Sequence, residues 1–277
     1  WRQLVPITMV VAFLLAVLPT LGSSFSGDWG MPDDQLNTVL TIQEENLGDG
    51  RVLWIGDDDV LAQSGQQFAG DFTVAVSSNL RSTFVDRWRP PNRQADHLLL
   101  ESLNLAMQNG TSNLGRLLAP LGITDIVLVE RSAPLPSKGL VFEIPESIKL
   151  ALSRQLDLTK SEIAPGITRY ENLSALGFAA FVDSGSTIGI EFREYAAESQ
   201  NILAARLISV DKFGKSYEGL LPSDSELFLA FPFSDSWRAS INGENIQPQV
   251  SLDWATGFSY NQSGLVQLNY EADSKHL

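Results

Sequence analysis

The feature that most constrains this chain is the uncharged apolar run at residues 4–21, which reads LVPITMVVAFLLAVLPTL. A bilayer core of roughly 30 Å needs a helix of about 20 apolar residues, so the run predicts a transmembrane helix within residues 1–22. Arg2 precedes the run, and Asp33 and Asp34 follow it. Because basic residues favour the cytoplasmic side, we expect the chain in a cell membrane with its bulk on the extracytoplasmic side.

The same run has an alternative interpretation as a secretory signal peptide. Such a signal has a basic start, a shorter apolar region and small residues before the cleavage site, and Gly22, Ser23 and Ser24 are small residues of that kind. The length of the run favours the membrane helix. The first residue is Trp1, which favours a segment of a longer polypeptide.

Composition excludes several classes of function. The 33 acidic and 19 basic residues leave a formal charge of −14, which argues against a nucleic-acid partner because such binding needs a basic surface. The absence of cysteine excludes disulfides, zinc–thiolate sites and iron–sulfur clusters, and is typical of a bacterial envelope domain of this size. Gly48 and Gly50 precede a predicted strand instead of following one, so no phosphate-binding loop and no cofactor are expected.

Residues 23–172 alternate predicted strands with predicted helices. Compact apolar runs indicate buried strands, and helices are bounded by capping residues and breakers. Strands are expected at residues 51–57, 72–76, 125–130 and 167–171, and helices at residues 33–43, 95–107, 113–118 and 145–157. This alternation predicts a small α/β layer domain with a partly parallel sheet.

Residues 173–277 change to short segments separated by turn residues. These segments are expected as strands at residues 178–183, 188–197, 226–233, 237–243, 247–252, 257–260 and 265–270, and residues 202–211 are compatible with a strand or a short helix. Asn242-Gly243 predicts a hairpin turn. Several short strands at this spacing predict an antiparallel β-sandwich domain.

Three consecutive carboxylates form a candidate metal site. Asp57, Asp58 and Asp59 follow the first predicted strand, and the carboxyl ends of strands are where open α/β sheets often place ligands. Carboxylate oxygens bind divalent cations. The alternative is an acidic surface turn, because no further ligand motif accompanies the three residues.

The candidates for catalysis are weak. Glu191 and Glu194 lie in a predicted strand, where side chains alternate between faces, so the pair points to opposite sides. His97 and His276 are the two histidines and are isolated, which leaves little material for a Ser-His-Asp triad. We therefore expect no catalytic residue in this chain.

An aromatic residue between two cations forms a candidate ligand-binding loop. Arg87, Trp88 and Arg89 precede Pro90 and Pro91, and aromatic rings stack on sugars while arginines bind anionic groups. Among the aromatic residues of the chain, this loop is the better candidate for contacting a lipid-linked or polymeric glycan. The alternative is an ordinary surface loop stiffened by its prolines.

Three segments in this order are similar to a known family. They are RLLAPLGITDIVLVE at residues 116–130, GITRYENLSALGFAAFVD at residues 166–183, and residues 231–273, which contain a Trp-x-Ala-x-x-Asn-Gly hairpin and a final Gly-x-Val-x-Leu-x-Tyr strand. The chain resembles the extracytoplasmic region of bacterial polytopic membrane proteins of the YfhO type, and of family 2 glycosyltransferases with a multi-spanning C-terminal region. It departs from that pattern where Leu173 to Leu176 follow Tyr170-Glu171-Asn172, and where Asn242 replaces the usual Asp.

The resemblance implies a domain held between membrane helices, with a role in assembling envelope glycans from lipid-linked sugars. It carries no catalytic residue onto this chain. The leading hypothesis is therefore a non-catalytic extracytoplasmic domain linked to glycan transfer. Two alternatives remain: an envelope polysaccharide-binding module with a single membrane anchor, and a secreted hydrolase that uses a metal at Asp57–Asp59.

Overall fold

The computed structural model describes residues 49–57, 61, 65–68, 72–78, 93–130, 143–164, 166–197, 205–206, 208–209 and 216–271. The helices predicted within residues 1–22 and 33–43 lie outside this set. In the part of the chain that is described, no helix combines the length and the apolar character needed to cross a bilayer. The fold is mixed α/β and mostly strands, with one partly parallel sheet and two antiparallel sheets, which confirms the predicted class at that level.

A six-stranded sheet forms the first part of the fold, with the strand order β2-β3-β1-β4-β6-β5. Its strands are β1 (Arg51–Gly56), β2 (Gln66–Phe68), β3 (Phe72–Ser77), β4 (Ile123–Val129), β5 (Leu158–Ala164) and β6 (Ile167–Asn172). The central pair β1 and β4 is parallel, and the other neighbours in this sheet are antiparallel. We call residues 49–172 the mixed-sheet region.

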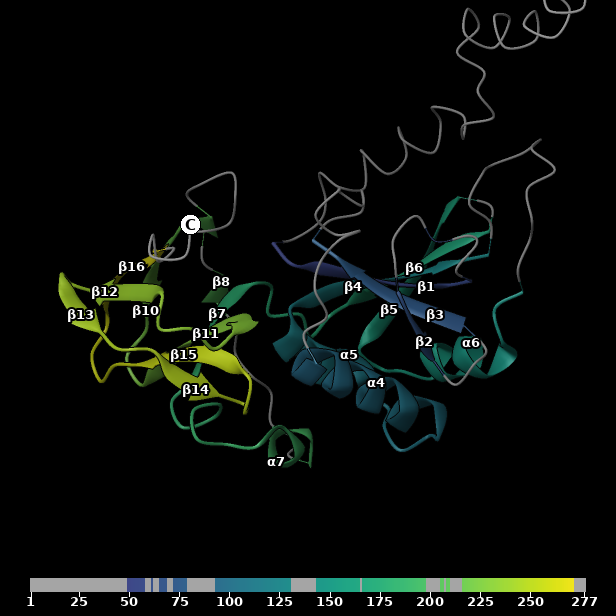
Figure 1. The fold of residues 1–277 in the computed structure, drawn as a ribbon, viewed down its shortest axis with the longest axis horizontal. Helices are drawn as coiled ribbons and strands as arrows, with labels where there is room; N and C mark the ends of the chain where they lie inside the picture. The colour runs from purple at the N-terminus through teal and green to yellow at the C-terminus, as the bar shows by residue number, and fades with distance from the viewer. Residues whose placement is uncertain are drawn as a thin grey trace, which may run out of the picture.

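The helices of this region lie on one face of the sheet (Figure 1). They are α4 (Arg93–Met107), α5 (Leu114–Leu118) with the 3₁₀ turn Ala119–Leu121, and α6 (Glu146–Ser153). Leu53 and Ile55 of β1 pack on this face, whereas Val52 and Trp54 belong to a separate apolar cluster. All six residues of β1 are buried, as expected for a parallel pair at the centre of a sheet.

Two five-stranded antiparallel sheets form the second part of the fold, with the orders β13-β12-β16-β10-β9 and β14-β15-β11-β7-β8. Their strands are β7 (Ala179–Asp183), β8 (Ala205–Arg206), β9 (Ile208–Ser209), β10 (Ser216–Leu221), β11 (Ser225–Pro232), β12 (Trp237–Ile241), β13 (Glu244–Ile246), β14 (Gln249–Ser251), β15 (Ala255–Ser259) and β16 (Gly264–Tyr270). Leu229 and Phe258 of one sheet share a buried cluster with Trp237 and Leu268 of the other. We call residues 179–271 the paired-sheet region.

The predicted hairpin at Asn242-Gly243 is confirmed. It joins β12 to β13, and both residues adopt the positive φ angles, 53° and 84°, that such a turn requires. The Asn242 side chain also accepts a hydrogen bond of 3.0 Å from the Leu265 N–H. The turn residue therefore links the hairpin to the start of β16.

The strand predicted at residues 188–197 is wrong, because the helix α7 (Phe192–Ala197) lies there. Phe192 and Tyr195 are buried, whereas Arg193 and Glu194 between them are exposed. This three-residue spacing is helical, and packing of the two rings selects it over the alternating pattern that the sequence also allows. The argument that Glu191 and Glu194 point to opposite faces of a strand is lost with that strand.

The helix predicted at residues 145–157 ends at Ser153. The next residues cap α5 instead: Gln155 accepts a hydrogen bond of 2.9 Å from the Leu114 N–H, and Asp157 accepts one of 2.7 Å from the Arg116 N–H. These side chains satisfy amide groups that a helix leaves free at its N-terminus.

The structure also contains four strands that the sequence did not predict, namely β2, β5, β10 and β13.

The two regions meet at a buried arginine. Arg51 at the start of β1 donates a hydrogen bond of 2.6 Å to the Leu121 carbonyl, and its guanidinium lies 5.0 Å from the Phe178 ring and 5.2 Å from the Phe231 ring. Arginine stacks on aromatic rings through cation–π attraction. The side chain thus joins the mixed-sheet region to strand β11 of the paired sheets.

A second junction connects α5 to α7. The Arg116 guanidinium lies 5.1 Å from the Tyr195 ring, and the Tyr195 hydroxyl donates a hydrogen bond of 3.2 Å to the Arg116 carbonyl. One buried apolar cluster also runs across the boundary, from Leu103 of α4 to Phe228 of β11. The two regions therefore share a core.

Candidate functional site

The structure covers one of the six residues that the sequence analysis proposed for ligands. Asp57 follows β1, and its carbonyl accepts a hydrogen bond of 2.9 Å from the Leu61 N–H. Asp58 and Asp59, and the whole Arg87–Trp88–Arg89 loop, lie outside the described residues. No group of three histidine, aspartate or glutamate side chains that could hold a metal occurs among the residues that are described. Both proposed sites therefore stay predictions.

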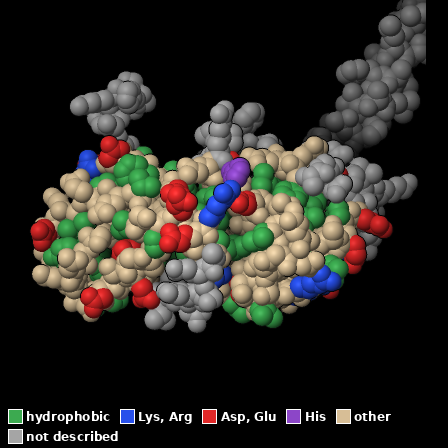
Figure 2. Space-filling view, turned by 90° about the horizontal axis from the view of Figure 1, so that it is seen from below, with side chains coloured by type: hydrophobic (Ala, Val, Ile, Leu, Met, Phe, Trp, Pro, Cys, Tyr) green, Lys and Arg blue, Asp and Glu red, His purple; other side chains and the backbone are tan. Residues whose placement is uncertain are grey.

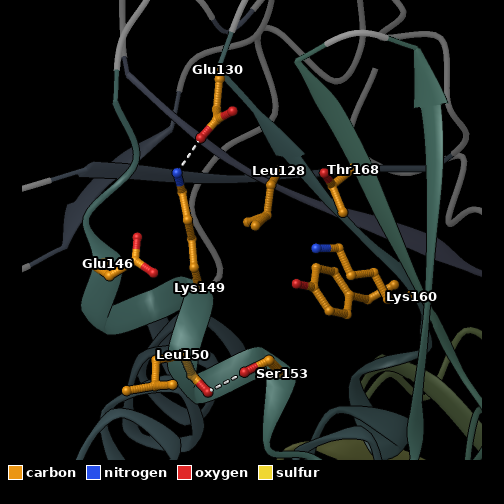
Figure 3. Close-up of a pocket in the computed structure, with 9 residues that line it drawn as sticks. Leu128, Glu130, Glu146, Lys149, Leu150, Ser153, Lys160 and Thr168 are labelled. Atoms are coloured by element: carbon orange, nitrogen blue, oxygen red, sulfur yellow. Dashed lines mark hydrogen bonds and ion pairs between the residues drawn. The ribbon is translucent and has the colours of Figure 1, made fainter.

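The structure brings together a different set of polar residues, between α6 and the outer strands of the six-stranded sheet. A pocket of about 280 Å³ opens there (Figure 3). Its lining consists of Leu128 and Glu130 from β4 and the residue after it, Glu146, Lys149, Leu150 and Ser153 from α6, Lys160 from β5, and Thr168 and Tyr170 from β6. Charged and hydroxyl groups dominate this lining.

The helix wall of the pocket follows from the helical period. Glu146, Lys149, Leu150 and Ser153 are spaced at i, i+3, i+4 and i+7, which places them along one side of α6. Buried residues of the same helix, such as Ile148, pack into the core instead. The amphipathic pattern that docks α6 on the sheet thus also turns its polar side towards the pocket.

The strand wall follows from the pairing register. Thr168 and Tyr170 are two residues apart on β6, so their side chains share a face. Lys160 of β5 is directly opposite Tyr170, and Leu128 of β4 is directly opposite Thr168. Cross-strand partners project to the same side of a sheet, which gathers these side chains beside α6.

An ion pair closes one side of the pocket. The Lys149 ammonium donates to the Glu130 carboxylate, and about a third of each side chain is exposed. The hydrogen bond to Glu130 is the main cause that raises the pKa of Lys149 above its usual value of 10.5, and the charge of Glu146 adds to it. Lys149 is therefore held in its charged form and is unsuited to act as a base near neutral pH.

The opposite side carries polar groups that have no partner within the described part of the protein. Lys160 forms no ion pair there, and neither Thr168 nor Tyr170 uses its hydroxyl in a hydrogen bond with those residues. Burial raises the pKa of Tyr170, and the nearby charge of Lys149 opposes that shift. Tyr170 thus keeps its proton and offers an O–H donor.

The lining favours binding over covalent catalysis. Ser153 is the serine of the pocket, and its hydroxyl donates a hydrogen bond of 2.9 Å to the Leu150 carbonyl of its own helix. An activated nucleophile needs a base within hydrogen-bond reach, and among the described residues the Ser153 hydroxyl bonds to no side chain that could act as one. The side chains of the lining can donate hydrogen bonds to a polar ligand and accept them from it.

Sequence reasoning found part of this pocket without recognising it. The helix at residues 145–157 and the strand at residues 167–171 were predicted, but β5 was not. Lys160, which lies on β5, was therefore not assigned to any strand or site. The sequence feature that could have indicated the pocket was the helical spacing of polar residues along α6. The strand β5 has a mostly exposed, polar sequence and lacks the apolar pattern by which strands are found.

Asn172, at the end of β6, has a structural role next to the pocket. Asn172 donates hydrogen bonds of 2.9 Å to the Gly115 carbonyl and 2.8 Å to the Ile123 carbonyl. It therefore ties the end of β6 to α5 and β4, and fixes the strand that carries Thr168 and Tyr170.

Comparison of the chain with protein-family models, with curated proteins and with solved structures finds no match.

Proposed function

We propose that this chain is an extracytoplasmic domain of a multi-spanning bacterial membrane protein involved in transferring cell-envelope glycans. Its own part is to bind and orient a glycan, and catalysis takes place elsewhere. The membrane placement rests on the apolar run at residues 4–21 and on the charges around it. The glycan role rests on the family resemblance together with the pocket beside α6.

The observation that carries the binding role is the composition of that pocket. Sugars present many hydroxyl groups, each able to donate and accept hydrogen bonds, and the lining offers carboxylates, hydroxyls and ammonium groups in a small space. Its volume of about 280 Å³ is just below the roughly 300–1,000 Å³ of most small-molecule sites. That size suits one sugar residue held by its edges.

The surface charge is consistent with a glycan and not with nucleic acid. The face shown in Figure 2 has scattered acidic side chains and few basic ones, in line with the formal charge of −14. A polyanion would be repelled by such a surface at long range. We therefore place the ligand in the polar pocket beside α6 and not on the acidic outer surface.

Titration of the purified full chain with a panel of monosaccharides, followed by protein NMR, tests the binding role. We expect shifts concentrated at α6, β5 and β6 for at least one sugar, and their loss in Lys160→Trp, whose larger side chain occupies the pocket. Ser161→Gln is a control on the same strand, because Ser161 does not line the pocket. Shifts that are absent for every sugar, or that map to the paired-sheet region, would contradict the proposal.

Membrane sidedness is tested separately by cysteine labelling. The chain has no cysteine, so Gln262→Cys on an exposed turn places a single thiol in the protein. In intact bacterial cells we expect a membrane-impermeant maleimide to label it. Labelling that appears only after lysis would place the domain on the cytoplasmic side.

A further inference from the structure

The two sides of the pocket differ in charge, and this difference indicates which sugar fits. Figure 3 shows Glu130, Lys149 and Glu146 together on one side and Lys160 with Thr168 on the other. We propose that the pocket selects a pyranose with one anionic substituent, a phosphate or a carboxylate, and binds that substituent at Lys160. This inference rests on the proposed glycan-binding function and adds the charge and the orientation of the ligand.

Lys160 is the cation available to an anion. Its amine nitrogen points towards the space between α6 and the sheet in Figure 3, and no carboxylate of the described residues pairs with it. The side chain is on an exposed edge strand, so a ligand can reach it from water. An anionic group here would form charge-assisted hydrogen bonds, which are about twice as strong as neutral ones.

Two hydroxyl donors lie on the same side as Lys160. Tyr170 is its cross-strand partner, and Thr168 follows on the same face of β6. Both hydroxyls lack hydrogen-bond partners among the described residues. An ammonium group with two O–H donors matches the several acceptor oxygens of a phosphate or a carboxylate.

The other side of the pocket accepts hydrogen bonds. The charge of Lys149 is already matched by Glu130, so this lysine offers little to a second anion. Glu146 is exposed and forms no ion pair with the described residues. Carboxylate oxygens only accept, so this side suits sugar hydroxyls and repels an anionic substituent. The ligand is thereby oriented with its anion at β5 and its hydroxyls at α6.

The test compares four probes on the purified full chain by isothermal titration calorimetry: glucose, glucose 1-phosphate, glucuronate and inorganic phosphate. We expect at least one anionic sugar to bind about ten times more tightly than glucose, because one charge-assisted contact replaces a neutral one. The preference should fall at high salt. Tighter binding of glucose 1-phosphate identifies the phosphate as the anion, and tighter binding of glucuronate identifies the carboxylate.

Variants separate the charge of Lys160 from its bulk. Lys160→Gln should remove the preference for the anionic sugar over glucose. Lys160→Arg should retain the preference, and Tyr170→Phe should reduce it about threefold through the lost O–H donor. Thermal unfolding of each variant shows that it is folded.

The outcomes distinguish this inference from the proposed function. Equal binding of glucose and both anionic sugars, unchanged in Lys160→Gln, would overturn the inference and leave a neutral glycan site in place. Binding of inorganic phosphate without any sugar would overturn both, because the site would then recognise a free anion. Lack of binding by all four probes, in a folded protein, would also overturn both.

Discussion

Glu226 in the paired-sheet region and Lys160 in the mixed-sheet region are both charged side chains on strands, yet their surroundings differ. The Glu226 carboxylate is buried and accepts hydrogen bonds from the Gly185 N–H at 2.6 Å, the Thr187 hydroxyl at 3.0 Å and the Ile188 N–H at 3.3 Å. Lys160 has no such partners among the described residues. One charge organises a turn of the protein, and the other remains available to a ligand.

This difference shows where function can reside in the fold. A buried charge is tolerated only when it is hydrogen-bonded, so Glu226 is committed to holding residues 185–188 against β11. Lys160, by contrast, lies on the exposed edge strand β5, where water solvates its side chain until a ligand arrives. We therefore expect changes in the paired sheets to affect stability, and changes at the pocket to affect binding.

The largest expected effect tests whether the two regions unfold together. Phe228→Ala removes a fully buried ring from the cluster that crosses the boundary, which should cost about 3–5 kcal/mol of unfolding free energy. Hydrogen exchange should then accelerate in both β1 and β16. Phe233→Ala is the control, because that ring is 42% exposed. Acceleration confined to β16 would show that the regions unfold independently.

The next largest effect concerns the buried carboxylate of Glu226. Glu226→Ala leaves two amide groups and a hydroxyl without their acceptor, and should cost roughly 3 kcal/mol in chemical denaturation. Sugar binding should stay unchanged, because Glu226 does not line the pocket. Glu218→Ala, at an exposed position of β10, serves as the control. A loss of sugar affinity in the folded Glu226→Ala protein would break the proposed division of roles.

The junction between α5 and α7 should weaken at high pH. Burial is the main cause that raises the pKa of Tyr195 to about 12, while Arg116 opposes the shift. The folded state therefore keeps the phenol protonated after the unfolded chain, with a pKa of about 10, has ionised. The stabilisation is complete below pH 10 and is lost as the pH rises towards 12, by about 1.4 kcal/mol at pH 11.

Denaturation midpoints at pH 9 and pH 11 measure this loss. Tyr195→Phe removes the titrating group and should lose less stability over the same interval than the wild-type protein does. Equal pH dependence of the two proteins would show that Tyr195 ionises as easily in the folded state as in the unfolded chain.

The smallest effect concerns the ion pair at the pocket. Glu130→Gln removes the main cause of the raised pKa of Lys149, so that pKa should fall, as measured by NMR of ¹³C-methylated lysines. The pair stabilises the fold below about pH 10.5 and loses this contribution as Lys149 deprotonates. Since both side chains are partly exposed, the contribution is under about 1 kcal/mol. Glu162→Gln, outside the pocket lining, should leave the Lys149 pKa unchanged.

Sequence reasoning was accurate where a local pattern decides the structure. The apolar run of β1, the helical spacing of α4 and the turn pair Asn242-Gly243 each depend on residues a few positions apart, and all three are present as expected. It was wrong at residues 188–197, where the same spacing fits a strand and a helix. Burial of Phe192 and Tyr195 decided that segment, and burial is a property of the folded chain.

The amino-acid sequence by itself determined the α/β character, the change to short strands after residue 172 and the acidic balance of the chain, because these depend on composition and on short-range periodicity. Only the tertiary structure decided the pocket. The pairing of β5 with β6 puts Lys160 opposite Tyr170, and the docking of α6 brings Lys149 to Glu130. Such contacts join residues distant in the chain, and their register is selected by the packing of the whole sheet and its helices.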